Sequence, residues 1–440
     1  MSEHALPVTT VRSGKPSVSE RARVDRRWRP GHLLLAPHRL GFFLAMIILV
    51  TAGAWWALVQ LDRVSVALSL PYALSPSLVH GAVMTFGFLP LFFSGFLFTA
   101  GPKWLGVAPL APRQLLAPLL LQVTGWLLCL AGAHLHGLTA LAGLALSAAG
   151  LTWMTALFWQ LLRRSPVEDQ IHARAIGSAC IVGCIALAAL PISLLLGAPA
   201  VARAFVLTGL WGFVVVVYVS VAHRMIPFFT SSALPFINAW RPFWVLWLML
   251  SVAAVEVAAV WIELDGRPPG AAGTVWIAVR GVFELAAGIV FVWLAVVWGL
   301  MQSLKNRLLA MLHIGFLWFG LALVLGGAAQ LLGIVEDTPV LPLAALHALT
   351  MGCLASLMLA MVTRVSCGHS GRALVADGLV WSLFLLLQAA TVLRIVAAAQ
   401  SPFPAWLLVA VVLLWVGIMG VWGVRLGNWY GRLRADGRPG

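Results

Sequence analysis

Residues Leu78–Gly106 read LVHGAVMTFGFLPLFFSGFLFTAGPKWLG, and this stretch decides how the rest of the chain is interpreted. Its middle is apolar enough to cross a membrane, yet it carries His80 near one end. A neutral imidazole in apolar surroundings needs a strong partner, and a metal ion is the commonest partner of that kind. The functional interpretation therefore depends on what His80 faces.

The composition excludes an ordinary soluble domain. The 440 residues are 62% hydrophobic and 10% charged, whereas soluble chains are about 45–50% apolar and about 25% charged. The net charge of +14 could suggest nucleic acid, but the basic residues lie in short loops and tails between apolar runs, where membrane topology explains them better. We therefore predict an all-α, polytopic membrane protein that is surrounded by lipid and has no nucleic-acid partner.

About twelve runs are long enough to span a bilayer, which takes about 20 apolar residues. We predict a membrane domain over residues 39–426, a disordered basic tail over 1–38 and a basic tail over 427–440. The predicted spans are Leu40–Leu61, Ser75–Ala100, Leu115–Ala133, Leu138–Leu162, Ile176–Leu196, Ala204–His223, Phe243–Ile262, Val275–Leu300, Leu309–Leu332, Leu341–Val362, Leu379–Ala398 and Trp406–Val424.

The distribution of Lys and Arg predicts the orientation. Basic residues precede the first span and then recur in alternate loops, as at Arg163-Arg164 and Arg224. The other loops are poor in Lys and Arg, and two are acidic, at Glu263-Leu264-Asp265 and Glu336-Asp337. By the positive-inside rule, both termini are expected to be cytoplasmic.

Two histidines are predicted to lie at the same depth. His80 in the second span and His347 in the tenth each fall about five residues from the outer end, or roughly 8 Å deep at 1.5 Å per residue. Two imidazoles that enter from one side to a common level could ligate one haem iron from opposite faces. The alternative is that each histidine makes a hydrogen-bonded contact between helices.

A second group of histidines is predicted at the cytoplasmic side. His223 closes the sixth span, His313 opens the ninth, His369 follows the tenth and His38 precedes the first. These four side chains could form a second site, or each could make a separate contact between helices.

Charges within the spans are costly and usually face a cavity or one another. Arg280 and Glu284 form a helical i, i+4 pair, Glu256 lies in the seventh span and Arg203 opens the sixth. In one interpretation Arg280 or Arg203 contacts haem propionates and Glu256 carries protons. In the other, arginine and glutamate form an interhelical ion pair without chemistry.

Three stretches resemble the NnrS family, haem- and copper-containing membrane proteins of denitrifying and related bacteria that are linked to nitric oxide metabolism and nitrosative stress. The second span, with His80-Gly81-x-x-Met84, also resembles the second helix of the haem–copper oxidase large subunit. The stretches are His80–Gly106, Arg224–Thr230 (RMIPFFT) and His347–Arg372, which includes HALTMG and MVTRVSCGHSGR.

The resemblance implies a b-type haem held by His80 and His347, nitric oxide as the small ligand, an unidentified electron donor and a place in the bacterial inner membrane. Any copper would be held by His223, His313 and His369. The family pattern His-x-His-Glu-Met is here His80-Gly81-Ala82-Val83-Met84, so one histidine and one glutamate of that pattern are absent.

Iron with two histidine ligands suits electron transfer, because a diatomic ligand needs an open coordination position. We therefore expect chemistry at a second place, near Arg224–Thr230, where Pro227 is predicted to break the sixth helix. Whether the protein is a nitric oxide-handling oxidoreductase is left open. The alternatives are a cofactor-free transporter, which often has twelve spans and interrupted helices, and a haem or copper insertion factor.

Overall fold

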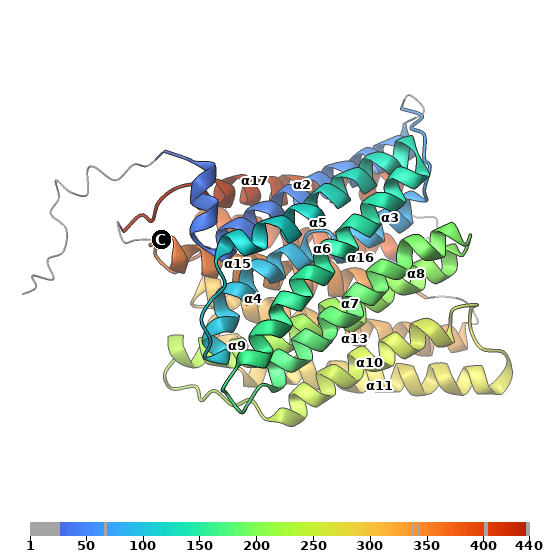
Figure 1. Ribbon diagram of the computed structural model, residues 1–440. Coiled ribbons are helices and arrows are strands. Elements are labelled where there is room, and N and C mark those ends of the chain that lie inside the picture. Colours follow the sequence, from blue (N-terminus) through green and yellow to red (C-terminus); the bar gives the residue numbers. More distant parts are fainter. Residues whose placement is uncertain are drawn as a thin grey trace, which may run out of the picture.

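The computed structural model describes residues 27–65, 68–336, 338, 340–341, 343–399 and 404–436. Within that part of the chain it is a bundle of helices with no strand (Figure 1). Most of the predicted N-terminal tail, Asp337 and the last four residues lie outside the described residues.

Twelve helices or helix groups are long and apolar enough to cross a membrane, which confirms the predicted number. The elements in chain order are η1 (Pro30–Leu35), α2 (Pro37–Val64), α3 (Pro76–Phe86), α4 (Leu89–Leu105), α5 (Pro112–Leu135), α6 (Gly137–Arg164), α7 (Ile171–Leu195), α8 (Pro199–Thr208), η2 (Gly209–Val215), α9 (Val216–Ala233), α10 (Phe243–Ile262), α11 (Gly270–Val297), α12 (Leu300–Ser303), α13 (Arg307–Val335), α14 (Ala344–His347), η3 (Ala348–Ala355), α15 (Ser356–His369), α16 (Gly378–Ala398) and α17 (Ala405–Tyr430).

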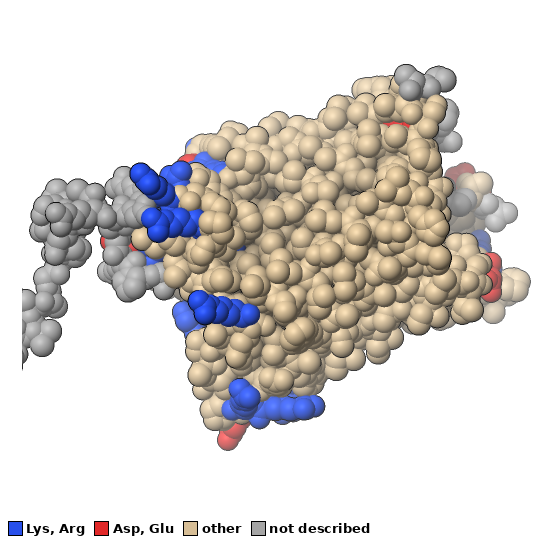
Figure 2. Space-filling view, turned by 45° about the horizontal axis from the view of Figure 1, so that its top comes forward, with Lys and Arg blue, Asp and Glu red and all other residues tan. Residues whose placement is uncertain are grey.

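The two ends of the described chain meet at one end of the bundle. The backbone N–H of Arg29 donates a hydrogen bond to the carbonyl of Gly431 (2.8 Å). Figure 2 shows Lys and Arg side chains gathered at this end, while uncharged residues cover the middle of the visible face. We call the end of the bundle where the two chain ends meet the terminal end, and the opposite end of the bundle the far end. The far end carries the start of α3 and the end of α2.

The second span is interrupted between α3 and α4, because Pro90 has no N–H to donate. In a continuous helix Pro90 would pair with the carbonyl of Phe86. That carbonyl instead accepts a hydrogen bond from Nε1 of Trp126 in α5 (3.0 Å). Unpaired backbone groups cost free energy within a membrane. This hydrogen bond gives the carbonyl of Phe86 a partner and so reduces the cost of the interruption.

The sixth span does not break at Pro227, so that prediction is wrong. α9 continues through Pro227 to Ala233, ten residues beyond the predicted end at His223. A proline in a helix removes one hydrogen bond and bends the axis. Apolar surroundings favour keeping the remaining bonds within the helix. The irregularity lies earlier, in the π-helical segment η2.

The tenth span has a similar π-helical segment, η3, which begins directly after His347. π-helical turns are rare and concentrate at functional sites. In both spans the π-helical segment follows a short helix at the far end, α8 in the sixth span and α14 in the tenth.

We expect Gly209→Ala to destabilise the protein. Its φ of −64° suits any residue, but a Cβ there would overlap the ring of Phe86, which is fully buried. Overpacking of this kind costs about 1–3 kcal/mol, and it should lower the thermal unfolding midpoint of the detergent-solubilised protein. Gly417→Ala is the matched control, because a Cβ at Gly417 meets nothing within 4 Å. Equal midpoints for the two variants would contradict the prediction.

Candidate functional site

A cavity of about 690 Å³ lies between the second, sixth and tenth spans and the helices α2, α16 and α17. It lies at the far end, because its lining includes Arg63 at the end of α2 and residues at the beginnings of α3, α8 and α14. Its size is within the range of about 300–1,000 Å³ that ligand and cofactor sites occupy. Its walls are mostly apolar, with Leu, Val, Met and aromatic side chains.

His80 lines this cavity from the fifth position of α3. Its ring stacks on the indole of Trp56, with 3.9 Å between centroids and 11° between planes. Its Nδ1 is buried and has no hydrogen-bond partner. Buried polar atoms without a partner are rare and need an explanation. The stacking fixes the plane in which this imidazole can meet a ligand.

His347 lines the same cavity from the end of α14. Its Nδ1 lies 2.8 Å from the carbonyl oxygen of Leu343. Because a carbonyl can only accept, Nδ1 carries the proton and the neutral ring keeps its lone pair on Nε2. A hydrogen bond that fixes the tautomer in this way is usual for histidines that ligate metals. The structure thus brings together the two histidines that the sequence singled out.

Three arginines contribute positive charge to the cavity from three different helices: Arg63, Arg203 and Arg394. Nη2 of Arg63 donates to Oγ of Ser77 (3.2 Å). Nη1 of Arg394 is buried without a partner. Together they can bind an anionic group at the far end.

The sequence interpretation named Arg203 but missed Arg63 and Arg394. A signal for Arg394 was present, because it is a charged residue inside the predicted span Leu379–Ala398. Arg63 lies two residues beyond the first predicted span, Leu40–Leu61, so it was not among the charges within spans.

The loop that follows α2 is fixed by Asp62. Its carboxylate accepts hydrogen bonds from the hydroxyl of Tyr72 (2.8 Å) and the N–H of Leu70 (3.0 Å). Burial and the hydrogen bond to Asp62 raise the pKa of Tyr72 to about 12, so the phenol keeps its proton. These contacts hold Leu70 and Tyr72 against the end of α2.

Arg280 does not line the cavity, although it was predicted to contact haem propionates. Its guanidinium instead forms ion pairs with Glu256 (2.7 Å), Glu263 (2.7 Å) and Glu284 (2.8 Å). Nε2 of Gln330 in α13 also donates to Glu284 (2.6 Å). The charges therefore join α10, α11 and α13, as in the alternative interpretation of an interhelical ion pair.

The three histidines predicted to hold copper, His223, His313 and His369, each make a separate contact. Nε2 of His313 lies 2.9 Å from the hydroxyl of Thr230, and the ring of His369 lies 4.6 Å from that of His38, between centroids. Within the described part of the chain, no three His, Cys, Asp or Glu side chains are arranged to hold a metal ion.

The contacts of His223 use both ring nitrogens. Nε2 donates to the carbonyl of Pro242 (3.1 Å), so Nδ1 accepts from Nε2 of His172 (2.9 Å). The neutral ring therefore has no free lone pair for a metal. The donor set predicted for copper does not fit a single ion.

Comparison with known protein families gives a match over nearly the whole chain. The family described as NnrS protein matches residues 32–434, nearly the whole chain. No curated protein matches it. Since the match takes in all twelve spans as well as both histidines of the cavity, the chain is a member of the NnrS protein family.

Proposed function

We propose that this membrane protein binds a b-type haem through His80 and His347, and that it acts in nitric oxide metabolism or in protection against nitrosative stress. The observation that carries the haem proposal is that two imidazoles from different spans line one cofactor-sized cavity. The link to nitric oxide rests on the family to which the chain belongs.

The residues of the cavity fit this group. The buried Nδ1 of His80 and the buried Nη1 of Arg394 have no partners, as expected of side chains whose partners include a ligand. Apolar walls suit a macrocycle, and guanidinium groups suit its propionates, which they can bind with paired hydrogen bonds. The lining therefore offers two imidazoles that would hold the iron, mostly apolar walls and positive charge for the propionates.

When bound, haem supplies a one-electron redox centre whose potential depends on its ligands and on solvent access. The side chains of the chain set those conditions. The carbonyl of Leu343 holds the proton of His347 on Nδ1, Trp56 orients the ring of His80 and the mostly apolar lining lowers the polarity around both rings. If His80 and His347 both held the iron, the haem would be suited to electron transfer.

The charge distribution supports an orientation and a location. Lys and Arg gather at the terminal end (Figure 2), so by the positive-inside rule we place this end in the cytoplasm and the cavity near the outer surface. The membrane in this proposal is the bacterial inner membrane.

The protein purified from membranes should show a Soret absorbance band and about one haem iron per chain, because one cavity supplies the pair of histidines that would hold it. Absorbance spectra and iron analysis of the detergent-solubilised protein measure this. A transporter without a cofactor would show neither signal, and that result would exclude the proposal. A haem insertion factor would give up its haem to an apoprotein that binds haem, whereas a resident haem would remain.

A further inference from the structure

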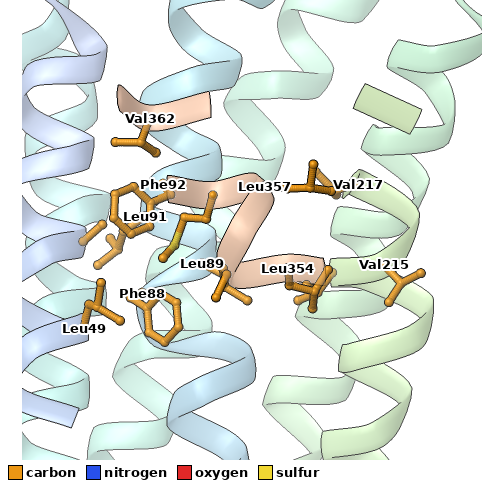
Figure 3. Close-up of a cluster of buried hydrophobic side chains, with 14 of the residues drawn as sticks. Leu49, Phe88, Leu89, Leu91, Phe92, Val215, Val217, Leu354, Leu357 and Val362 are labelled. Atoms are coloured by element: carbon orange, nitrogen blue, oxygen red, sulfur yellow. The ribbon is translucent and has the colours of Figure 1, made fainter. Parts of the chain in front are cut away.

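Basic side chains gather at the terminal end, on the opposite side of the bundle from the histidine cavity. Along α2 and α15, buried apolar side chains separate the two places, with Leu49 and Val362 among them (Figure 3). The start of α2, the end of α15 with the turn after it, and the segment after α17 contribute six basic residues. We call them the basic cluster: His38, Arg39, His369, Arg372, Arg432 and Arg434.

Hydrogen bonds to the backbone hold the three segments of the basic cluster together. Nη1 of Arg39 donates to the carbonyls of Tyr430 (3.2 Å) and Arg432 (2.6 Å). Nη1 of Arg434 donates to the carbonyl of His369 (3.3 Å). The start of the first span and the end of the tenth are therefore both tied to the segment after α17, and their basic side chains form one group.

Within the described residues, this group has more positive charge than carboxylates to balance it. Asp436 accepts hydrogen bonds from Nε (3.0 Å) and Nη2 (2.7 Å) of Arg434. Arg39, Arg372 and Arg432 form no ion pair with a described carboxylate. Since buried charges are usually paired, the cluster has positive charge to offer to an anion.

Membrane topology alone does not account for the basic cluster. The positive-inside rule describes an excess of basic residues in cytoplasmic loops. His38 and Arg39 are instead each 3% exposed and lie in the first turn of α2. A charge enclosed in this way is costly unless its surroundings compensate it. The two carbonyls that Arg39 contacts do so only in part, because a carbonyl has no net charge.

Three side chains of the cluster have a buried polar atom without a hydrogen-bond partner: Nδ1 of His38, Nη1 of Arg372 and Nε of Arg432. The two guanidinium N–H groups can only donate. Buried polar atoms without a partner are rare and need an explanation. Together these atoms favour a ligand whose oxygens accept hydrogen bonds.

Arg372 shows the cost of gathering these charges. Its guanidinium lies over the indole of Trp429, 4.3 Å from the ring centroid, and its charge repels those of Arg39 and Arg432. Burial lowers the pKa of Arg372, and the positive charges of Arg425 and Arg432 lower it further. A bound anion would oppose these effects, because a nearby negative charge favours the charged form of a guanidinium.

We propose that the basic cluster binds one phosphate group, either that of an anionic phospholipid headgroup or free phosphate. The oxygens of a phosphate can accept hydrogen bonds from several guanidinium groups at once. Basic pockets between spans on the cytoplasmic side, where we place the terminal end, are suited to lipid headgroups. The site involves no residue of the histidine cavity, so it stands independently of the haem proposal.

Native mass spectrometry of the full-length protein in detergent tests this site. Phosphatidylglycerol should form an adduct that persists at collision energies that remove phosphatidylcholine, whose phosphate charge is balanced by choline. Arg372→Gln and Arg432→Gln should each weaken the phosphatidylglycerol adduct about tenfold, because each removes a hydrogen bond from a charged donor. The control is Arg113→Gln, at an exposed arginine near the start of α5 at the same end, which should bind like the wild type.

Inorganic phosphate distinguishes the two sources. If the cluster takes free phosphate, inorganic phosphate should displace the lipid and raise the thermal unfolding midpoint of the wild type but not of Arg432→Gln. If it takes only headgroups, inorganic phosphate should do neither. Arg432→Lys keeps the charge and should recover part of the lipid binding, which a folding defect would not allow. Equal adducts in the wild type and both glutamine variants, or no response to either probe, would overturn the proposal.

Discussion

His80→Ala should abolish the low-spin haem spectrum of the purified protein. The replacement removes one of the two imidazoles that line the cavity, so the proposed haem iron would lose a ligand and change its spin state. Optical spectra in the Soret and visible regions, together with the haem content per chain, measure this. His347→Ala should have the same effect, because it removes the second proposed ligand, which lies in α14.

Added imidazole sharpens this test. In either variant the missing side chain leaves space for a free imidazole, which should restore the low-spin spectrum in a concentration-dependent way. His136→Ala is the matched control, since His136 is exposed at the same end of the bundle and lies outside the cavity lining. A low-spin spectrum that survives His80→Ala would remove His80 from the site.

The number of spans could be predicted from the sequence because the bilayer dictates it. A run of about 20 apolar residues is required for each span, and charges are excluded from most of its length. All twelve predicted runs correspond to helices in the structure. The similar depth of His80 and His347 was predicted by the same counting, and the packing of their spans then brings both to one cavity.

What the sequence could not supply is how helices pack side by side. Arg63, Arg203 and Arg394 lie in three distant parts of the chain, and only the packing of α2, α8 and α16 brings them to one cavity. The π-helical segments also could not be predicted from the sequence. Gly209 begins one of them and leaves room for the ring of Phe86, a contact between two spans that has no local sequence pattern.

At the terminal end, the positions of histidines along their spans did not predict which of them lie together. His223 and His313 were both predicted to lie near the ends of spans, but in the structure each contacts a partner on another element, His172 in one case and Thr230 in the other. Two residues at the same level can face different sides of a bundle. Two residues at the same depth form one site only when the helices that carry them also border the same cavity, as His80 and His347 do.

The ion-pair cluster around Arg280 should matter more for stability than any other polar group of the far end. The side chains of Glu256 and Glu284 are 6% and 4% exposed, and that of Arg280 is 15% exposed. Each carboxylate is therefore largely removed from water and relies on the guanidinium for compensation. Removing one partner of a buried ion pair costs about 3–5 kcal/mol, because the other charge stays buried without a partner.

Arg280→Met keeps most of the side-chain volume and removes the charge. It should lower the thermal unfolding midpoint by far more than the control variant Arg113→Met. Arg113 is exposed, and a change there is expected to cost about 0.5 kcal/mol or less. Adding Glu256→Gln and Glu284→Gln to Arg280→Met should recover most of the loss, because the carboxylates that need the guanidinium are then neutral. Haem content should stay at the wild-type level in every variant that folds, because Arg280 lies outside the cavity lining. Loss of haem at unchanged stability would instead mean that the guanidinium contacts the propionates.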